Sequence, residues 1–172
     1  MIKLLHAADL HLGSPITGRS DAQAAYLRRA LESVPGLLAD LCKKEQCDLV
    51  VLSGDVFDAN PSPATVQNLK HALEEMAVPV FISPGNHDPF PPGCVWDRES
   101  WPQNVTVFRS QVPLGIPLPR LDCEVYGAAF RSMDCPGLLE NFRVSGERKY
   151  RIGGSWFIEL CTNGCSCLSH RS

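Results

Sequence analysis

Three short segments of the sequence carry side chains that bind divalent metal ions. They are Asp9-Leu10-His11, Gly54-Asp55-Val56-Phe57-Asp58 and Gly85-Asn86-His87-Asp88. Carboxylate, imidazole and amide groups in one set suit Mn²⁺, Fe²⁺ or Zn²⁺ better than Ca²⁺, which prefers oxygen ligands alone. The three segments therefore predict a metal site, provided that the fold brings them together.

The second segment suggests why two ions would bind instead of one. A carboxylate that bridges two cations about 4 Å apart lets them stabilise both the attacking and the leaving oxygen of a phosphoryl displacement. Asp55 is the natural bridge, and Gly54 and Gly85 allow the main chain to turn sharply and approach the ions. These residue types predict hydrolysis of a phosphate ester.

Short apolar runs alternate with helical patterns in the first half of the chain. Buried strands are predicted at residues 2–7, 49–52 and 78–82. Helical spacing covers residues 22–45, and Ser62-Pro63 begins a second helix whose apolar stripe ends at Met76. This alternation predicts an α/β fold with a parallel sheet, so the three polar segments should follow strands at one edge of that sheet.

The chain after Pro84 is rich in proline, which predicts loops and short extended pieces. Strands are predicted at residues 105–108 and 124–128, a short helix at 137–142 and an extended segment from residue 150. Trp96 and Trp101 flank Arg98 in one loop. They could stack on a nucleic-acid base, but loop aromatics more often pack over a core, and we predict the latter.

The ordered set Asp-x-His, Gly-Asp-x-x-Asp and Gly-Asn-His-Asp resembles the calcineurin-like metallophosphoesterase superfamily over roughly residues 1–90. Residues 6–13 and 54–58 are similar to those of DNA repair exonucleases, namely SbcD-type subunits and their meiotic-recombination counterparts in eukaryotes. The resemblance implies a partial metallophosphoesterase fold, in which a mostly parallel sheet flanked by helices forms an incomplete four-layer α/β/β/α sandwich.

The resemblance also implies which residues hold the metals. Asp9 and His11 would bind the first ion, Asp55 would bridge the two ions, and Asn86 would bind the second. The cofactors implied are two divalent metal ions, with Mn²⁺ first among them and Fe²⁺ or Zn²⁺ as alternatives.

Two further residues have catalytic roles by resemblance. His87 would donate a proton to the leaving oxygen or stabilise the phosphate, and Asp88 could orient the His87 ring. Asp58 either belongs to the site or ties down its loop, since it lies three residues beyond the bridging position.

The family pattern requires more histidines on later strands, in a Gly-His or His-Gly element and in a final Gly-His-x-His. His170 is the sole histidine after His87, and its surroundings do not match either element. Each missing histidine removes a ligand, so the resemblance predicts under-coordinated metals and weak or absent activity for these 172 residues.

The tail at residues 154–172 differs from the sequence before it, being rich in Cys and Ser and lacking strand or helix periodicity. We interpret residues 1–153 as the N-terminal part of a metallophosphoesterase domain and the tail as the product of a shifted reading frame. If the codon of Ser155 is TCA, a shift of one base converts Ser-Trp-Phe into His-Gly, an element that the family requires. The alternative is a small zinc site formed by Cys161, Cys165, Cys167 and His170.

Composition excludes several classes of protein. With 172 residues, 44% hydrophobic and 20% charged, the chain fits one soluble globular domain. No apolar run approaches the roughly 20 residues of a membrane span, and the N-terminus lacks the pattern of a signal peptide. The sequence therefore predicts a cytoplasmic protein without a membrane partner.

The function predicted from the motifs is metal-dependent phosphodiester hydrolysis. The resemblance implies exonucleolytic cleavage of DNA alongside an SbcC-like ATPase subunit, whereas the net charge of −3 gives no basic surface of its own to suggest nucleic acid. Two alternatives stay open at this point. One is a phosphomonoesterase or cyclic-nucleotide phosphodiesterase, and the other is a non-catalytic remnant or interaction module.

Overall fold

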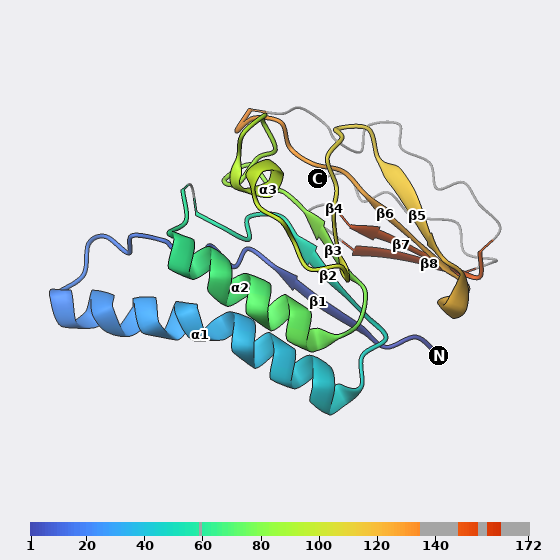
Figure 1. Ribbon diagram of the computed structural model, residues 1–172, viewed down its shortest axis with the longest axis horizontal. Coiled ribbons are helices and arrows are strands. Elements are labelled where there is room, and N and C mark those ends of the chain that lie inside the picture. The colour runs from blue at the N-terminus through green and yellow to red at the C-terminus, as the bar shows by residue number, and fades with distance from the viewer. Residues whose placement is uncertain (59, 135–147, 155–157, 163–172) are drawn as a thin grey trace.

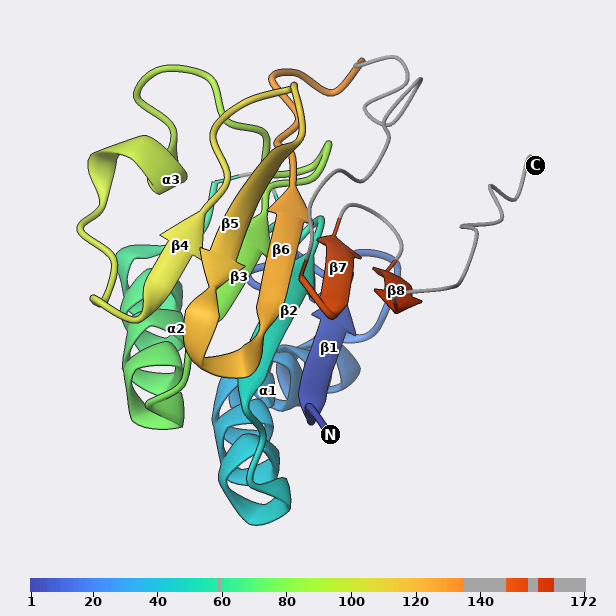
Figure 2. The same cartoon turned by 90° about the vertical axis from the view of Figure 1, so that its right-hand side faces the viewer.

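Two four-stranded sheets lie face to face, and two long helices cover the outer face of the first sheet (Figure 1). The structure is a computed structural model that describes residues 1–58, 60–134, 148–154 and 158–162. Figure 2 looks across the second sheet onto the first, with both helices behind them. The described layers, helices then sheet then sheet, confirm the predicted α/β class.

The first sheet is parallel throughout. Its strands are β1 (Leu4–Ala8), β2 (Leu49–Ser53), β3 (Val80–Ser83) and β4 (Val105–Val107), in that spatial order. The strands predicted at residues 2–7, 49–52, 78–82 and 105–108 are confirmed, with their ends displaced by one or two residues. Parallel alignment places the carboxyl ends of β1, β2 and β3 at a single edge, as predicted from the order of strands and polar segments.

The two long helices are α1 (Asp21–Glu45) and α2 (Pro63–Met76), and both begin at capping serines. The Ser20 hydroxyl accepts from the main-chain N–H of Gln23, whose side chain accepts from Ser20 in return. The Ser62 hydroxyl caps α2 by accepting from the main-chain N–H of Thr65, and proline occupies the first helical position. Both predicted helices are thus confirmed, and α1 continues through Pro35.

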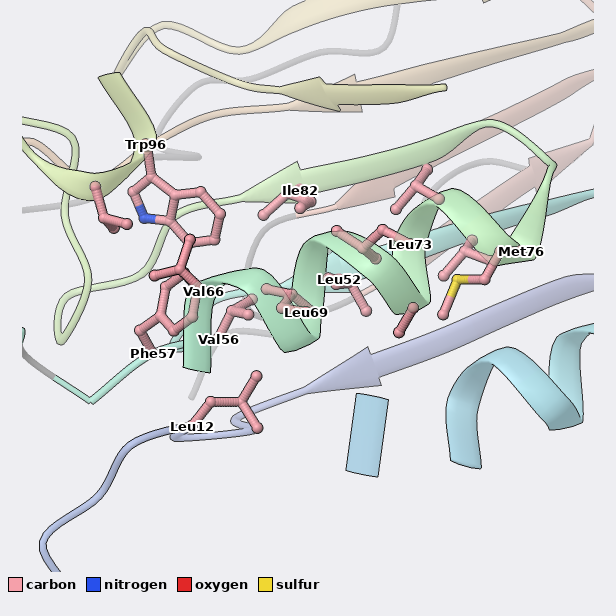
Figure 3. Packing of buried hydrophobic residues seen from close by; sticks show 14 of the residues in the cluster. Leu12, Leu52, Val56, Phe57, Val66, Leu69, Leu73, Met76, Ile82 and Trp96 are labelled. Atoms are coloured by element: carbon pink, nitrogen blue, oxygen red, sulfur yellow. The ribbon is translucent and has the colours of Figure 1, made fainter. Parts of the chain in front are cut away.

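One hydrophobic core lies between the helices and the first sheet (Figure 3). The stripe of α2 packs there against Leu52 and Ile82, and all of its members are buried: Val66, Leu69, Leu73 and Met76. Trp96 is fully buried at the end of this core nearest the polar loops, beside Phe57. The prediction that Trp96 packs over a core is confirmed.

The second sheet has mixed strand directions. Its strands are β5 (Leu114–Leu118), β6 (Cys123–Gly127), β7 (Tyr150–Gly154) and β8 (Ile158–Thr162), in that spatial order. β5 and β8 are antiparallel to their neighbours, whereas β6 and β7 are parallel to each other. A second core of Phe81, Phe108, Cys123, Val125 and Ile152 joins the two sheets.

Some elements differ from the sequence-based expectation. The sequence does not predict β5 because Gly115 and Pro117 interrupt it, but proline is tolerated at the edge of a sheet, which is where β5 lies. The short helix α3 (Val95–Arg98) and the 3₁₀ turn η1 (Pro119–Leu121) are too brief to show periodicity.

The tail also departs from expectation. Its sequence predicts no regular structure, yet β8 lies within it and pairs with β7. The predicted helix at residues 137–142 lies outside the described residues. Across the described ranges, no helix combines the length and apolar character that crossing a membrane requires.

Candidate metal centre

The segments that follow β1 and β2 run side by side at the carboxyl edge of the first sheet. The Asp9 N–H donates to the Gly54 carbonyl at 3.2 Å, and the His11 N–H donates to the Asp55 carbonyl at 2.9 Å. A parallel bridge between Leu12 and Phe57 continues the pairing beyond the strands. The first two polar segments are therefore fixed against each other by the main chain.

The backbone at these residues has an unusual conformation. Asp9, His11 and Asp55 have φ values of 52°, 46° and 48°, in the left-handed region that L-residues avoid. Such strain costs of the order of 1–2 kcal/mol per residue and concentrates at functional sites. The polar segments thus adopt a costly geometry that aims their side chains at a common point.

Asp9, His11 and Asp55 form a group with the geometry of a metal site. One potential ligand atom from each lies within 4.8 Å of the others. Asp55 is almost fully buried at 2% exposure, whereas Asp9 is open to solvent. The residues predicted to hold the first ion are brought together, and two carboxylates with an imidazole suit a divalent transition metal.

Asn86 points to the same chemistry from the loop after β3. Its side-chain oxygen is buried and has no hydrogen-bond partner among the described residues. A buried oxygen without a partner carries a desolvation cost of about 1–3 kcal/mol, which coordination to a cation would remove. This observation fits the predicted role of Asn86 as a ligand of the second ion.

Gly85 is the residue that allows the loops after β2 and β3 to approach. A Cβ atom at this position would overlap the carboxylate and the main-chain nitrogen of Asp55. In the absence of a side chain there, the His87 N–H reaches Asp55 Oδ1 at 2.9 Å. Asp55 is thereby held in place from the side of β3, which suits a residue that must bridge two ions.

Asp58 is the carboxylate that contacts His87, the residue with a predicted catalytic role. Its Oδ1 atom lies 3.2 Å from His87 Nδ1, and the His87 ring meets the His11 ring edge to face with centroids 4.9 Å apart. The hydrogen bond from the Ser14 hydroxyl is the main cause that lowers the pKa of Asp58; burial opposes it, and the contact with the His87 ring lowers the pKa further. Asp58, left open by the sequence, therefore belongs to the site.

The role predicted for Asp88, orienting the His87 ring, is corrected here. Its carboxylate accepts hydrogen bonds from the main chain instead. Oδ1 accepts from the Gly85 N–H at 2.7 Å and Oδ2 accepts from the Phe57 N–H at 3.0 Å. Burial raises the pKa of Asp88 to about 7, although these two hydrogen bonds oppose the shift. Asp88 joins the two loops, while Asp58 takes the orienting position predicted for Asp88.

Spacing in the sequence does not distinguish Asp58 from Asp88 as the partner of His87. Asp58 and Asp88 each lie a few residues beyond a strand, and either could reach an imidazole. The decisive fact is that the loop amides of Gly85 and Phe57 need an acceptor, which Asp88 supplies from the interior. The alternative zinc site at residues 161–170 lies outside the part of the chain whose side chains are described.

Comparison with known proteins gives one family and two informative relatives. The calcineurin-like phosphoesterase family matches residues 2–152. The chain is 32% identical over 166 residues to the uncharacterized metallophosphoesterase YhaO of Bacillus subtilis, covering 88% of this chain and 40% of that protein. It is 33% identical over 94 residues to the SbcD component of the nuclease SbcCD of Staphylococcus saprophyticus, covering 51% of this chain and 23% of that component.

The matches support the superfamily predicted from sequence over more of the chain than they support the SbcD-type subfamily. The resemblance to the superfamily is confirmed, and the match to the SbcD component extends over about half of the chain. The chain spans well under half the length of either relative. The family match stops at residue 152, and the shifted reading frame beyond it stays a prediction.

Proposed function

The chain belongs to the calcineurin-like phosphoesterase family, and on that premise we propose that it hydrolyses phosphodiester bonds of DNA with divalent metal ions. The observation that carries the proposal is the meeting of Asp9, His11 and Asp55 at one sheet edge, next to the unpartnered oxygen of Asn86. The DNA substrate is supported more narrowly, by the partial similarity to a nuclease component.

The roles of the ligands are those that the resemblance implies, and the grouping of Asp9, His11 and Asp55 supports them. Asp9 and His11 would hold the first ion, Asp55 would lie between the two ions, and Asn86 would hold the second. When bound, the ions supply Lewis-acid activation of the phosphate and of water, and Mn²⁺ is our first candidate, with Fe²⁺ or Zn²⁺ as alternatives.

His87 and Asp58 would handle the proton. Asp58 accepts from Nδ1 of His87, which leaves Nε2 to face the phosphate and to donate a proton to the leaving oxygen. The Asp58 carboxylate also fixes the orientation of the His87 ring. Its loss should reduce turnover by about 10- to 100-fold, the usual cost of removing a partner that orients a catalytic group.

A protein partner forms part of the proposal. The similarity to one component of a nuclease named SbcCD supports an SbcC-like ATPase as that partner. The net charge of −3 offers little attraction to a DNA backbone, so we expect a partner to supply much of the DNA affinity.

The first test is metal binding by the full 172-residue chain. We expect Mn²⁺ to bind, as measured by loss of the free-ion signal in electron paramagnetic resonance, and Asp55→Asn to weaken binding by at least tenfold. Asp40→Asn, which alters an exposed carboxylate on α1, is the matched control and should bind like the unaltered chain.

The second test is turnover. We expect slow, Mn²⁺-dependent release of nucleotides from duplex DNA, lost in His87→Ala, and less hydrolysis of aryl phosphomonoesters. Preference for a phosphomonoester or a cyclic nucleotide would replace the DNA substrate with that class. A folded chain that binds no Mn²⁺ would contradict the proposal and favour a non-catalytic remnant.

A further inference from the structure

A cavity of about 390 Å³ opens beside the catalytic histidine. Its walls come from the loop after β3, from α3 and from the segment that follows β6, and they include His87, Pro91, Pro92, Arg98 and Met133. The volume falls within the range of about 300–1,000 Å³ that small-molecule sites occupy. Because His87 lines it, a group bound in this cavity lies beside the residue that we propose as the proton donor.

Hydrogen bonds hold the walls of the cavity in place. The indole N–H of the fully buried Trp96 donates to the Asp88 carbonyl at 2.7 Å. The Phe90 N–H donates to the Phe130 carbonyl at 2.7 Å, and the Gly93 N–H donates to the Asp97 carboxylate at 3.0 Å. The cavity is therefore preformed, which reduces the entropy lost when a ligand binds.

The lining of the cavity combines apolar surface with a positive charge. Pro91, Pro92 and the exposed side chain of Met133 offer apolar surface for a flat ring. Arg98 adds a cation whose side chain is 60% exposed and whose Nε lies 3.9 Å from the Glu99 carboxylate, longer than a hydrogen bond. A ligand with a planar apolar part and an anionic part matches both features.

We propose that this cavity binds the nucleoside attached to the leaving oxygen, with its base against Pro91, Pro92 and Met133 and an adjoining phosphate at Arg98. The assignment rests on the proposed function, because His87 donates its proton to the leaving side. It names the substrate class of that side as a nucleotide and makes Arg98 and Met133 determinants of specificity.

The test compares two probes that differ only in the base. Thymidine 5′-monophosphate and 2-deoxyribose 5-phosphate are titrated into the metal-free, full-length chain, and affinity is measured from NMR shifts, including the indole N–H of Trp96. We expect the nucleotide to bind about tenfold more tightly, because its base removes apolar surface of Pro91, Pro92 and Met133 from water.

Two variants separate the two parts of the ligand. Arg98→Ala should weaken both probes by about tenfold, and Arg98→Lys should restore most of that loss because it retains the charge. Met133→Ala should weaken the nucleotide by about threefold and leave the sugar phosphate unchanged. Arg28→Ala, at an exposed position on α1, is the control for a general change in charge.

The outcomes are distinct from those of the metal-binding test. Equal affinity for the two probes, or equal nucleotide affinity in Arg98→Ala, would overturn the cavity assignment even if Mn²⁺ binds as expected. Failure of Mn²⁺ binding with the predicted nucleotide selectivity would instead remove the hydrolytic function and leave a nucleotide-binding cavity.

Discussion

The carboxyl edge of the first sheet and the interior of the second sheet are built on opposite principles. All buried polar or charged side chains of the described residues belong to β2, β3, α2 or the loops after these strands: Ser53, Asp55, Thr65, Ser83 and Asp88. The described strands of the second sheet bury Cys123, Val125 and Ile152 against the first sheet. The first region buries polar groups whose cost hydrogen bonds offset in part, and the other region stabilises the fold by apolar burial.

The difference explains where function can reside in this fold. Left-handed backbone at Asp9, His11 and Asp55, with the unpartnered oxygen of Asn86, would be selected against in a region that served packing alone. The face of the second sheet that packs against the first bears such costs less, because the side chains buried there are apolar. It provides the rigid surface against which the strained loops are held.

The sharpest test of this contrast uses one glycine from each region. Gly85→Ala would place a methyl group against Asp55, and Gly127→Ala would place one against the buried ring of Phe108. Each should lower the free energy of unfolding by about 3 kcal/mol through overpacking. Gly85→Ala alone should abolish Mn²⁺ binding, because it displaces the bridging carboxylate.

Urea unfolding and Mn²⁺ titration of both variants provide the comparison. Should either alanine variant fail to fold in buffer alone, a stabilising osmolyte allows the same measurement on that variant. Equal loss of metal affinity in the two variants would mean that the second sheet shapes the site directly. That result would contradict the separation of roles between the two sheets.

The next effect concerns the pH dependence of stability. Asp88 has a pKa of about 7 in the folded protein, raised by burial from an ordinary value of 3.8. Between these values the folded state keeps a proton that the unfolded chain releases, so this group destabilises the fold progressively as pH rises from about 4 to about 7. Asp88→Asn removes that dependence.

Urea unfolding of the metal-free protein at pH 5 and pH 8 measures this pH dependence of stability. From pH 5 to pH 8, the unaltered chain should lose roughly 2–3 kcal/mol more stability than Asp88→Asn does. Asp40→Asn should follow the unaltered chain. Parallel pH profiles for the unaltered chain and Asp88→Asn would show that Asp88 is ionised in the folded state.

The smallest expected effect belongs to the second sheet. The Tyr126 hydroxyl donates to the Glu124 carboxylate at 2.7 Å in a partly buried pair. Tyr126→Phe should therefore lower the free energy of unfolding by about 1 kcal/mol, read from urea unfolding. Mn²⁺ affinity should stay unchanged, and a weakened affinity would contradict the separation of roles between the sheets.

Much of the first sheet is accessible from sequence because its signals are local. Buried parallel strands appear as apolar runs, and the serine that precedes proline at position 63 marks the start of α2 without tertiary information. The order of polar segments then places Asp9, His11 and Asp55 at one edge through topology alone, which the structure confirms.

The remainder depends on contacts between distant segments. β5 contains Gly115 and Pro117 and becomes a strand because β6 offers it a partner. The exchange of roles between Asp58 and Asp88 is set by which main-chain amides need an acceptor inside the loops. Spacing in the sequence carries no information on either point.

β1 is an edge strand of the first sheet as described. A metal ion bound beside it would therefore also stabilise the fold. β1 shares main-chain hydrogen bonds with β2 alone in that sheet, although it delivers Asp9 and His11. An ion bound by these residues and Asp55 would cross-link the N-terminal strand to the loop after β2. Each tenfold rise in free ion above the dissociation constant would add about 1.4 kcal/mol to folding stability. Metal supply would then regulate how long the folded protein persists, independently of any reaction that it catalyses.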